Sequence, residues 1–341
     1  MYATADKLSE TGRALLTQSS NFHPFFGDGL SNHLPMALIA LDRLGGSPAR
    51  LNAFYSGSIP GLAGFKPAVQ PLHPVDAMGN PDHFASALLY FQRTIVEDGP
   101  EDVLRRWLPE LIPGIAAASF HGLIRLGYAI EASSTSEIAS ALALWTTSFT
   151  SLGSPGYLVD EMPVAIVKRL SISIANHPVS PGLIVDRMTA IASMSSLQFS
   201  DSQPRQLSLS DVADFAISAY ASFDDFTLLH AVTATHAFRL ITPFIADSEL
   251  ATRYLWRAIM IGGLSTGLPL HNDWPNETTH AVPTHTAGWA DIAARAVESD
   301  DEHVIKLVYT AFVESRTYAD PLYQYVAMRQ VASIGAIALA G

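Results

Sequence analysis

The sequence predicts an all-α protein, built as a single large helical domain with long irregular loops. Along most of the 341 residues, apolar side chains recur three and four positions apart, which is the spacing of one helix face. Alternating runs and tight hairpin turns between β-branched segments are scarce, so extended sheets are not expected. Apolar residues make up 48% of the chain and charged residues only 15%, which supplies a large buried core.

One domain is expected to span residues 1–341, and no repeat of fixed period is visible. Two helical halves that divide near residues 150–155 are the alternative, because length alone does not decide the number of domains.

In the first half, the expected helices are separated by segments rich in glycine and proline. Residues 45–80 contain many of both and are expected to form a long irregular connection. The small residues of 116–122 should let helices approach closely and place His121 deep inside. The expected helices cover 5–18, 34–44, 84–96, 101–131 with breaks at Pro109 and Pro113, and 136–150.

In the second half, capping residues mark several helix starts. Ser208 and Asp211 form one such signal, the pair Asp224-Asp225 forms another, and Ser299 with Glu302 has the spacing of a capping box. Residues 262–285 are expected to be a loop. The expected helices cover 157–174, 181–194, 208–220, 224–241, 248–260, a segment after Glu302, and 321–340.

Charge and hydropathy exclude several classes of protein. The formal net charge is −12 and no basic cluster offsets it, so a nucleic-acid partner is not expected. No run of eighteen apolar residues predicts a membrane span, and the N-terminal residues lack the basic-then-apolar order of a secretory signal. These features favour a cytoplasmic protein with no membrane partner.

The chain has no cysteine and twelve histidines. Absence of cysteine excludes disulfides, iron–sulfur clusters, thiolate zinc sites and cysteine nucleophiles. Any bound metal must therefore use nitrogen and oxygen ligands. Nucleophile-elbow, dinucleotide-binding and phosphate-loop motifs are also missing.

Several histidines lie in apolar, helix-like stretches, where an unpaired imidazole is costly. His33, His121, His230 and His236 are such residues, so each is expected to be hydrogen-bonded, catalytic or metal-bound, and the segments that carry them are expected to converge on one pocket. On one regular helix, six residues turn the rings of His230 and His236 about 120° apart. Either a helix break brings both into the site, or one supports the other. A core histidine satisfied by a neighbouring hydroxyl such as that of Thr233 is the alternative for His230 and for His236, and a capping or loop role is the alternative for His33.

His303 and Lys306 share one face of a predicted helix, with Asp300 one turn earlier. A solvated polar stripe would explain the spacing as well, but the surrounding residues are apolar. A desolvated lysine has a lowered pKa, and its neutral amine can react with carbon dioxide to form a carbamate. Such a group resembles a carboxylate and can bind a metal.

His121, Arg125 and Tyr128 form one polar stripe on a hydrophobic helix. A buried arginine needs an anionic partner, which can be a substrate, a carboxylate or a metal-bound oxygen species. Tyr128 and the aromatic residues Phe25, Phe26 and Phe120 are candidates for the wall around a planar substrate.

Four segments together resemble the questin oxidase-like family, in a likeness spread over about residues 20–330. They are Phe26-Gly27-Asp28-Gly29-Leu30-Ser31-Asn32-His33-Leu34-Pro35-Met36, Phe120-His121-Gly122-Leu123-Ile124-Arg125-Leu126-Gly127-Tyr128, His230-Ala231-Val232-Thr233 and Asp301-Glu302-His303-Val304-Ile305-Lys306. Fungal members of that family are associated with oxidative opening of anthraquinone rings. They act as Baeyer–Villiger-type oxidases or as ring-cleaving dioxygenases.

In the ring-cleaving branch, the resemblance implies a mononuclear non-haem iron held by histidines and a carboxylated lysine. It makes His33, His121, His230 and His236 the imidazole ligands and Lys306 the carbamate ligand. His303 is then a supporting residue or a competing ligand. Arg125 stands where many relatives carry another histidine.

These observations predict an Fe(II)-dependent oxygenase that cleaves an aromatic or quinone-like secondary metabolite, or inserts oxygen into it, using dioxygen. His303, Arg125 and Tyr128 are its expected catalytic residues. One alternative is a Baeyer–Villiger-type oxidase that uses NADPH as co-substrate and has no protein-bound metal. Another is a non-enzymatic helical protein that binds a small molecule.

Overall fold

The computed structural model describes residues 7–198, 201–272, 288–332 and 334, and confirms the all-α prediction. Helix accounts for 66% of the structure and strand for 5%. Within the described residues, no helix combines the length and the apolar character needed to cross a bilayer.

The first half forms helices and one short hairpin, in which β1 and β2 pair antiparallel. In chain order the elements are α1 (Glu10–Ser19), β1 (Phe25–Phe26), β2 (Leu30–Ser31), α2 (Leu34–Arg43), α3 (Pro48–Ser58), α4 (Pro74–Ala77), η1 (Pro81–His83), α5 (Phe84–Asp98), α6 (Pro100–Leu111), η2 (Ile112–Gly114), α7 (His121–Glu131) and α8 (Thr135–Thr147).

The second half adds one parallel strand pair, β3 with β4. Its elements are β3 (Tyr157–Val159), α9 (Pro163–Ile174), α10 (Ile184–Ala192), α11 (Ser195–Gln198), β4 (Asp201–Pro204), α12 (Leu209–Phe223), α13 (Phe226–Ile241), η3 (Thr242–Phe244), α14 (Ser248–Leu264), α15 (Trp289–Glu298), α16 (Glu302–Tyr318) and α17 (Pro321–Val331).

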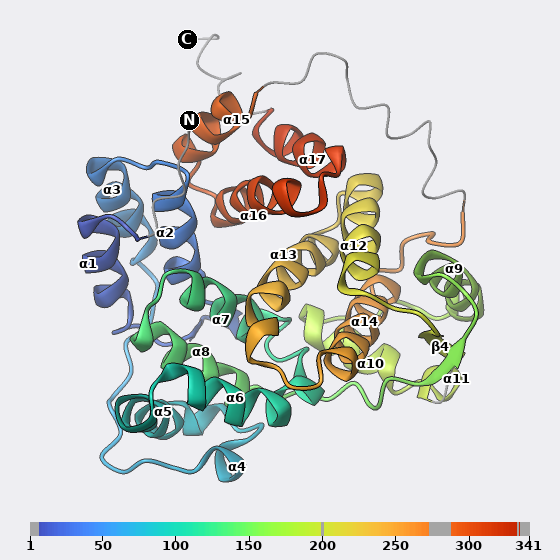
Figure 1. The fold of residues 1–341 in the computed structure, drawn as a ribbon, viewed down its shortest axis with the longest axis horizontal. Coiled ribbons are helices and arrows are strands. Elements are labelled where there is room, and N and C mark those ends of the chain that lie inside the picture. The colour runs from blue at the N-terminus through green and yellow to red at the C-terminus, as the bar shows by residue number, and fades with distance from the viewer. Residues whose placement is uncertain (1–6, 199–200, 273–287, 333, 335–341) are drawn as a thin grey trace.

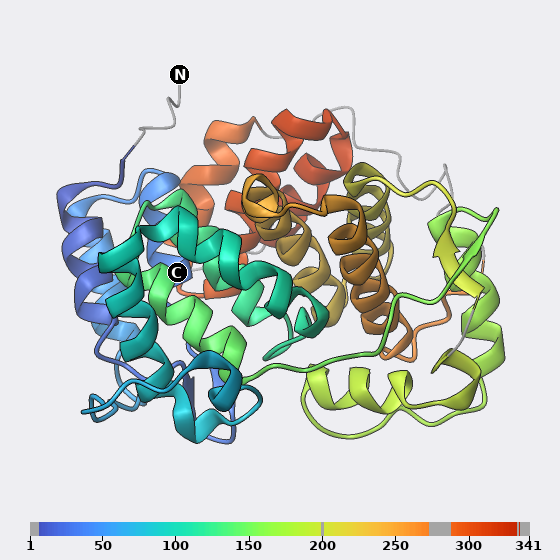
Figure 2. The ribbon, with the colours of Figure 1, turned by 60° about the horizontal axis from the view of Figure 1, so that its bottom comes forward.

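Four helices from distant parts of the chain meet in the middle of the molecule. Helix α13 packs against α7 and α16, and α2 packs against α7 and α16. Figure 1 shows α13 at the centre, with α16 above it, α7 below it and α2 to the left. In Figure 2, the helices α5, α6 and α8 lie to one side of this group and α9 to α11 to the other.

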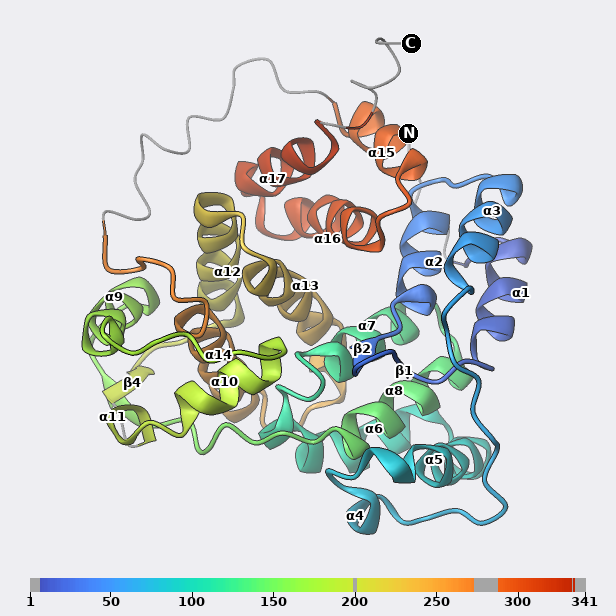
Figure 3. The same cartoon turned by 180° about the vertical axis from the view of Figure 1, so that it is seen from behind.

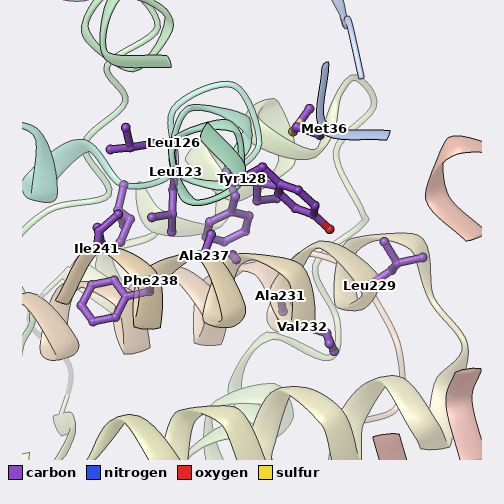
Figure 4. Packing of buried hydrophobic residues seen from close by; sticks show 14 of the residues in the cluster. Met36, Leu123, Leu126, Tyr128, Leu229, Ala231, Val232, Ala237, Phe238 and Ile241 are labelled. Atoms are coloured by element: carbon purple, nitrogen blue, oxygen red, sulfur yellow. The ribbon is translucent and has the colours of Figure 1, made fainter. Parts of the chain in front are cut away.

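Buried apolar side chains from Leu8 to Val331 form one cluster, with members on both sides of residues 150–155. Part of it is the contact between α7 and α13, where Leu123 on α7 lies above Ala237 and Ile241 on α13 (Figure 4). The single domain over residues 1–341 stays a prediction.

Some expectations about helices are wrong. The expected irregular connection over 45–80 contains α3 and α4, and α15 was not foreseen. Helix α3 begins where Ser47 caps the chain and Pro48 occupies the first turn, with Ser47 Oγ accepting a hydrogen bond from Arg50 N at 3.2 Å. A capped start therefore outweighs the glycine and proline content of the segment.

Most of the other expected starts hold with shifts of a few residues. Ser208 caps α12 and Asp225 caps α13, as predicted. Tyr157 begins the short strand β3 rather than a helix. Of the expected loop over 262–285, the helix α14 takes the first residues and 273–285 lie outside the described residues, as do 335–340 of the last expected helix.

Replacing Gly127 by alanine is expected to destabilise the fold, because α7 and α13 touch there. A Cβ atom at Gly127 would lie 2.6 Å from Ala237 Cβ and 2.7 Å from its Cα. Overpacking of this kind costs about 1–3 kcal/mol, of which the better helix propensity of alanine recovers about 1 kcal/mol. Urea unfolding followed by circular dichroism measures the difference.

Gly57 supplies the matched control, because it is also a helical glycine but its Cβ would meet nothing within 4 Å. The substitution Gly57→Ala should leave stability unchanged or raise it by up to about 1 kcal/mol. Equal shifts in the two variants would contradict the close approach of α7 and α13.

Candidate metal centre

Four imidazoles meet where the N-terminal ends of the four central helices converge. His33 caps α2, His121 is the first residue of α7, and His303 lies in the first turn of α16. His230 lies one turn into α13. In Figure 3, the β1–β2 hairpin that leads into α2 lies beside α7. The tertiary structure thus brings together three of the four predicted imidazole ligands, and His303 with them.

We call these four residues, His33, His121, His230 and His303, the histidine cluster. Each ring contacts two others of the cluster. The centroid of His33 lies 4.6 Å from that of His121 and 4.7 Å from that of His303. The remaining two centroid distances are 4.9 Å from His121 to His230 and 5.7 Å from His230 to His303.

Each ring presents Nδ1 to an oxygen acceptor. His121 Nδ1 lies 2.5 Å from the Ala118 carbonyl oxygen, and His230 Nδ1 lies 2.8 Å from that of Phe226. The Nδ1 atoms of His33 and His303 face carboxylates instead, Glu302 Oε1 at 3.3 Å and Asp301 Oδ1 at 3.4 Å. An oxygen acceptor holds the proton on Nδ1, which leaves the Nε2 lone pair free in each neutral ring.

With the proton on Nδ1 of each ring, no Nε2 atom of the cluster can donate to another. His33 Nε2 and His121 Nε2 lie 2.6 Å apart, and the potential ligand atoms of His33, His121 and His230 all lie within 4.8 Å of one another. His230 Nε2 and His303 Nε2 are buried and find no hydrogen-bond partner in the described part of the chain. Lone pairs that face each other repel unless a cation lies between them. This donor set therefore fits a metal that accepts nitrogen ligands.

Burial keeps His33, His121 and His230 neutral. Burial first, and then the nearby charge of Lys306, lower the pKa of His121 to about 3. Burial also holds the pKa values of His33 and His230 well below 6.5, with contributions from Lys306 and from the neighbouring rings. Since a metal binds the unprotonated nitrogen, these ligands need no deprotonation at neutral pH.

Lys306 lies one turn after His303 on α16 and is buried. Burial lowers the pKa of its amine to about 7, while the carboxylates of Glu302 and Asp301 oppose the shift. Its charge acts on the pKa of His33, His121 and His230, which places the amine beside the histidine cluster. A substantial neutral fraction of this amine is therefore present near pH 7.

The turn before α7 is strained. Three consecutive residues, Ala118, Ser119 and Phe120, have φ values of 49°, 59° and 70°. The left-handed region costs about 1–2 kcal/mol per residue in L-amino acids, and the surrounding structure must hold the turn in place. Ser119 Oγ accepts a hydrogen bond from Val185 N at 3.1 Å, and the Ala118 carbonyl orients His121. The expected continuous helix through residues 116–120 is therefore wrong.

The close helix approach that was predicted from the small residues of 116–122 occurs at Gly122. A Cβ atom there would lie 2.8 Å from Trp145 Cβ on α8. The close approach of α7 and α8 buries His121, as expected from the run of small side chains.

An apolar cavity of about 780 Å³ opens onto the histidine cluster. Among its lining residues are all four rings of the cluster and the side chains of Phe25, Phe26, Phe149, Ile184 and Phe226. Its volume is typical of small-molecule sites. Of the predicted aromatic wall, Phe25 and Phe26 line the cavity, whereas Phe120 and Tyr128 are fully buried and do not.

His236 does not join the histidine cluster. Its Nδ1 lies 2.5 Å from Glu314 Oε1 and its Nε2 lies 3.9 Å from Glu131 Oε2. Helix α13 continues without a break between His230 and His236, so the six-residue spacing turns His236 towards α16 and the end of α7. Of the two readings of this spacing, the helix break is wrong.

Arg125 and Tyr128 also lie away from the cavity. The anionic partner of Arg125 is a carboxylate, because its Nε and Nη2 both lie 2.9 Å from Glu137 Oε2 of α8. The Tyr128 hydroxyl donates to the Lys306 carbonyl oxygen at 3.2 Å and lies 3.2 Å from Thr310 Oγ1. The structure therefore places Arg125 in the core and Tyr128 behind the backbone of Lys306.

Sequence reasoning missed the carboxylates of Asp301 and Glu302 as partners of the imidazoles. Glu302 was expected in a capping box with Ser299, but Asp301 caps α16, with Asp301 Oδ1 accepting a hydrogen bond from His303 N at 2.7 Å. This frees Glu302 to face His33 across the helix boundary. Asp300 pairs with Arg50 at 2.9 Å and is exposed. The run of acidic residues before His303 was the sequence signal that could have indicated the carboxylate partners of the imidazoles.

Known proteins resemble this chain in part. A stretch of 161 residues is 29% identical to the Baeyer-Villiger oxidase AgnL3 of Paecilomyces divaricatus, over 40% of this chain and 34% of that protein. A stretch of 158 residues is 28% identical to the Baeyer-Villiger monooxygenase AacuH of Aspergillus aculeatus, over 41% of this chain and 33% of that protein. The matches thus span about a third of the length of these curated relatives.

The sequence profile of questin oxidase-like proteins matches residues 30–311. This match takes in more than half of the chain and contains the whole histidine cluster together with Lys306. The resemblance expected from the four quoted segments is confirmed, and the chain belongs to the questin oxidase-like family.

Proposed function

We propose that this protein is a metal-dependent oxygenase that acts on an aromatic or quinone-like secondary metabolite, with Fe(II) as its metal. The observation that carries the proposal is the set of inward Nε2 atoms, each on a ring whose Nδ1 faces an oxygen, at the floor of an apolar cavity. His33, His121 and His230 would hold the metal. His303 and Lys306 are the further candidates for its coordination.

Nitrogen and oxygen donors suit iron(II), and such a metal, when bound, supplies the means to activate dioxygen. The protein's own residues would orient the ligands and bind the substrate. The Ala118 and Phe226 carbonyls and the carboxylates of Asp301 and Glu302 orient the imidazoles. The phenyl rings that line the cavity would exclude water and hold a planar substrate against the cluster.

Lys306 is proposed to carry a carbamate. Its neutral amine would attack carbon dioxide, forming an N–C bond and releasing one proton, and the product is an anion. Four helix N-termini converge here and favour negative charge, so the carbamate would balance the metal in a buried site.

Apoprotein reconstituted with iron is expected to need bicarbonate for full metal occupancy, because carbon dioxide supplies the carbamate. Isotope-labelled bicarbonate should give a carbamate signal in the carbon NMR spectrum of the wild type. The Lys306→Met variant should lack that signal, whereas Lys168→Met, a change at a lysine far from the cluster in α9, should keep it. A wild-type protein that fills with iron in carbon-dioxide-free buffer would contradict the carbamate.

A second candidate function is favoured by the names of the two relatives, which are Baeyer–Villiger enzymes. In that reaction one oxygen atom enters next to a ketone carbonyl and the other leaves as water, with two electrons from NADPH. In a dioxygenase reaction, both oxygen atoms enter the product and no reductant is consumed.

The two functions are separated by metal analysis combined with labelled dioxygen. Purified protein is analysed by mass spectrometry for transition metals before and after chelation, and turnover of an anthraquinone is followed with and without NADPH. We expect close to one iron per chain, activity lost on chelation, and both labelled atoms in the product. Full activity of metal-free protein with NADPH, with one labelled atom incorporated, would replace the proposal by the second candidate.

A further inference from the structure

A second buried guanidinium lies outside the candidate metal centre and has no acidic partner. Arg257, on α14, has only 2% of its surface exposed. Its Nε donates a hydrogen bond to the Leu152 carbonyl oxygen at 2.7 Å, and its Nη1 is buried without a partner. Among the residues that the structure describes, no carboxylate forms an ion pair with it.

The other buried arginine, Arg125, differs from Arg257 because it has an acidic partner. Arg125 is equally buried, and it pairs with the buried carboxylate of Glu137. Water can satisfy the hydrogen bonds of a guanidinium but cannot balance its charge, so an unpaired buried arginine is costly. Since no described residue supplies the missing anion, a bound anionic ligand is the candidate partner of Arg257.

The guanidinium of Arg257 is reached from a pocket of about 400 Å³ lined by Ser151, Gly153, Ser154, Thr189 and Ser193. We call it the Arg257 pocket. Ser151 Oγ accepts a hydrogen bond from Gly153 N at 3.2 Å, so its hydroxyl proton is available to a ligand. Gly153 has a φ of 87°, and a Cβ there would lie 3.2 Å from Arg257 Nη2, so the backbone closes tightly on the guanidinium.

The Arg257 pocket is a neighbour of the substrate cavity. Thr150 lines the cavity and Ser151, the next residue, lines the pocket. On α10, which packs against α14, Val185 lines the cavity and Thr189, one turn later, lines the pocket. A ligand with an anionic group in the pocket can therefore extend towards the histidine cluster.

We propose that the Arg257 pocket binds a phosphate group. The guanidinium and the hydroxyls of Ser151 and Ser154 offer several donors to a tetrahedral oxyanion, whereas Thr189 and Ser193 already donate to backbone carbonyls. Arginine is the side chain best suited to phosphate. The phosphate would come either from free phosphate or from a phosphorylated co-substrate such as NADPH. The inference does not depend on the metal, so it can fail or hold independently of the function proposed above.

Binding is tested on the full chain by calorimetric titration with inorganic phosphate, and by thermal unfolding in phosphate and in chloride of the same ionic strength. The Arg257→Met variant keeps most of the side-chain volume and removes the charge. We expect it to bind phosphate roughly tenfold more weakly or worse, because charge-assisted hydrogen bonds are lost. Arg93→Met, an exposed arginine on α5, is the control and should bind like the wild type.

The Arg257→Met variant should also unfold in chloride at the same or a higher temperature than the wild type, since an unpaired buried charge is gone. If it does not fold, Ser154→Ala removes one exposed hydroxyl and should weaken phosphate binding several-fold. The wild type is then titrated with NADPH and NADH. Competition of NADPH, but not NADH, with phosphate identifies the nucleotide as the source, and lack of competition identifies free phosphate.

Either of two results would overturn the proposal. One is a wild-type protein that binds no phosphate at millimolar concentration and shows no phosphate-dependent rise in unfolding temperature. The other is a folded Arg257→Met variant that binds phosphate as tightly as the wild type.

Discussion

Replacing His230 by alanine is expected to remove the metal while leaving the helices folded. Its Nε2 is one of the candidate metal-ligating atoms and has no hydrogen-bond partner among the described residues. The substitution therefore removes only one hydrogen bond from the fold, the one between His230 Nδ1 and the Phe226 carbonyl oxygen. Changes to residues that only orient a ligand weaken metal affinity about 10–100-fold, so loss of a ligand should exceed that. Metal analysis and circular dichroism of the same sample measure both effects, and turnover should fall with the metal.

His236 is the matched control, because it lies on the same helix, is equally buried and faces away from the cluster. The His236→Ala variant should keep its metal and lose about 1–3 kcal/mol of stability, since Glu314 retains only its pairing with Arg239. Loss of metal in both variants, or in neither, would contradict the assignment of His230 to the centre.

Replacing Glu137 by glutamine is expected to give one of the largest losses of stability of any single change in the core. The substitution keeps the shape of the side chain but leaves the Arg125 guanidinium buried without a balancing charge. Removal of one partner from a buried ion pair costs about 3–5 kcal/mol. The free energy of urea unfolding measures this loss.

An exposed ion pair provides the comparison. Glu161 binds Arg169 at the surface, and Glu161→Gln should cost at most about 1 kcal/mol. The double variant Arg125→Met with Glu137→Leu should recover most of the stability lost in Glu137→Gln, because it removes both charges together. Similar losses in Glu137→Gln and Glu161→Gln would show that Arg125 finds another partner.

Elements with a continuous apolar face and a clear cap could be predicted well. Helix α13 is the best case, since Asp225 caps it and apolar residues line both sides of His230. Helix α3 and the start of α16 were harder to predict from the sequence, because competing local signals occur at both places. Ser47 with Pro48 outweighed the surrounding glycines, and Asp301 displaced Ser299 as the cap of α16.

Some features of the candidate site could likewise be predicted from the sequence, and others could not. The type of each residue was informative, since an imidazole in an apolar helix needs a partner. His33, His121 and His230 come together, and the charge of Lys306 acts on all three. For His236 the spacing gave the direction of the ring around the helix axis. It did not give the helix that the ring would face.

From the sequence alone follow the helical class, the nitrogen and oxygen character of any metal site, and the burial of its histidines. Those properties depend on residue type and on the period of one helix. Only the tertiary structure decided that His303 joins the cluster, that His236 pairs with Glu314, and that Glu137 neutralises Arg125. These contacts join segments far apart in the chain, and the close packing of α7 against α8 and α13 at Gly122 and Gly127 sets which side chains meet.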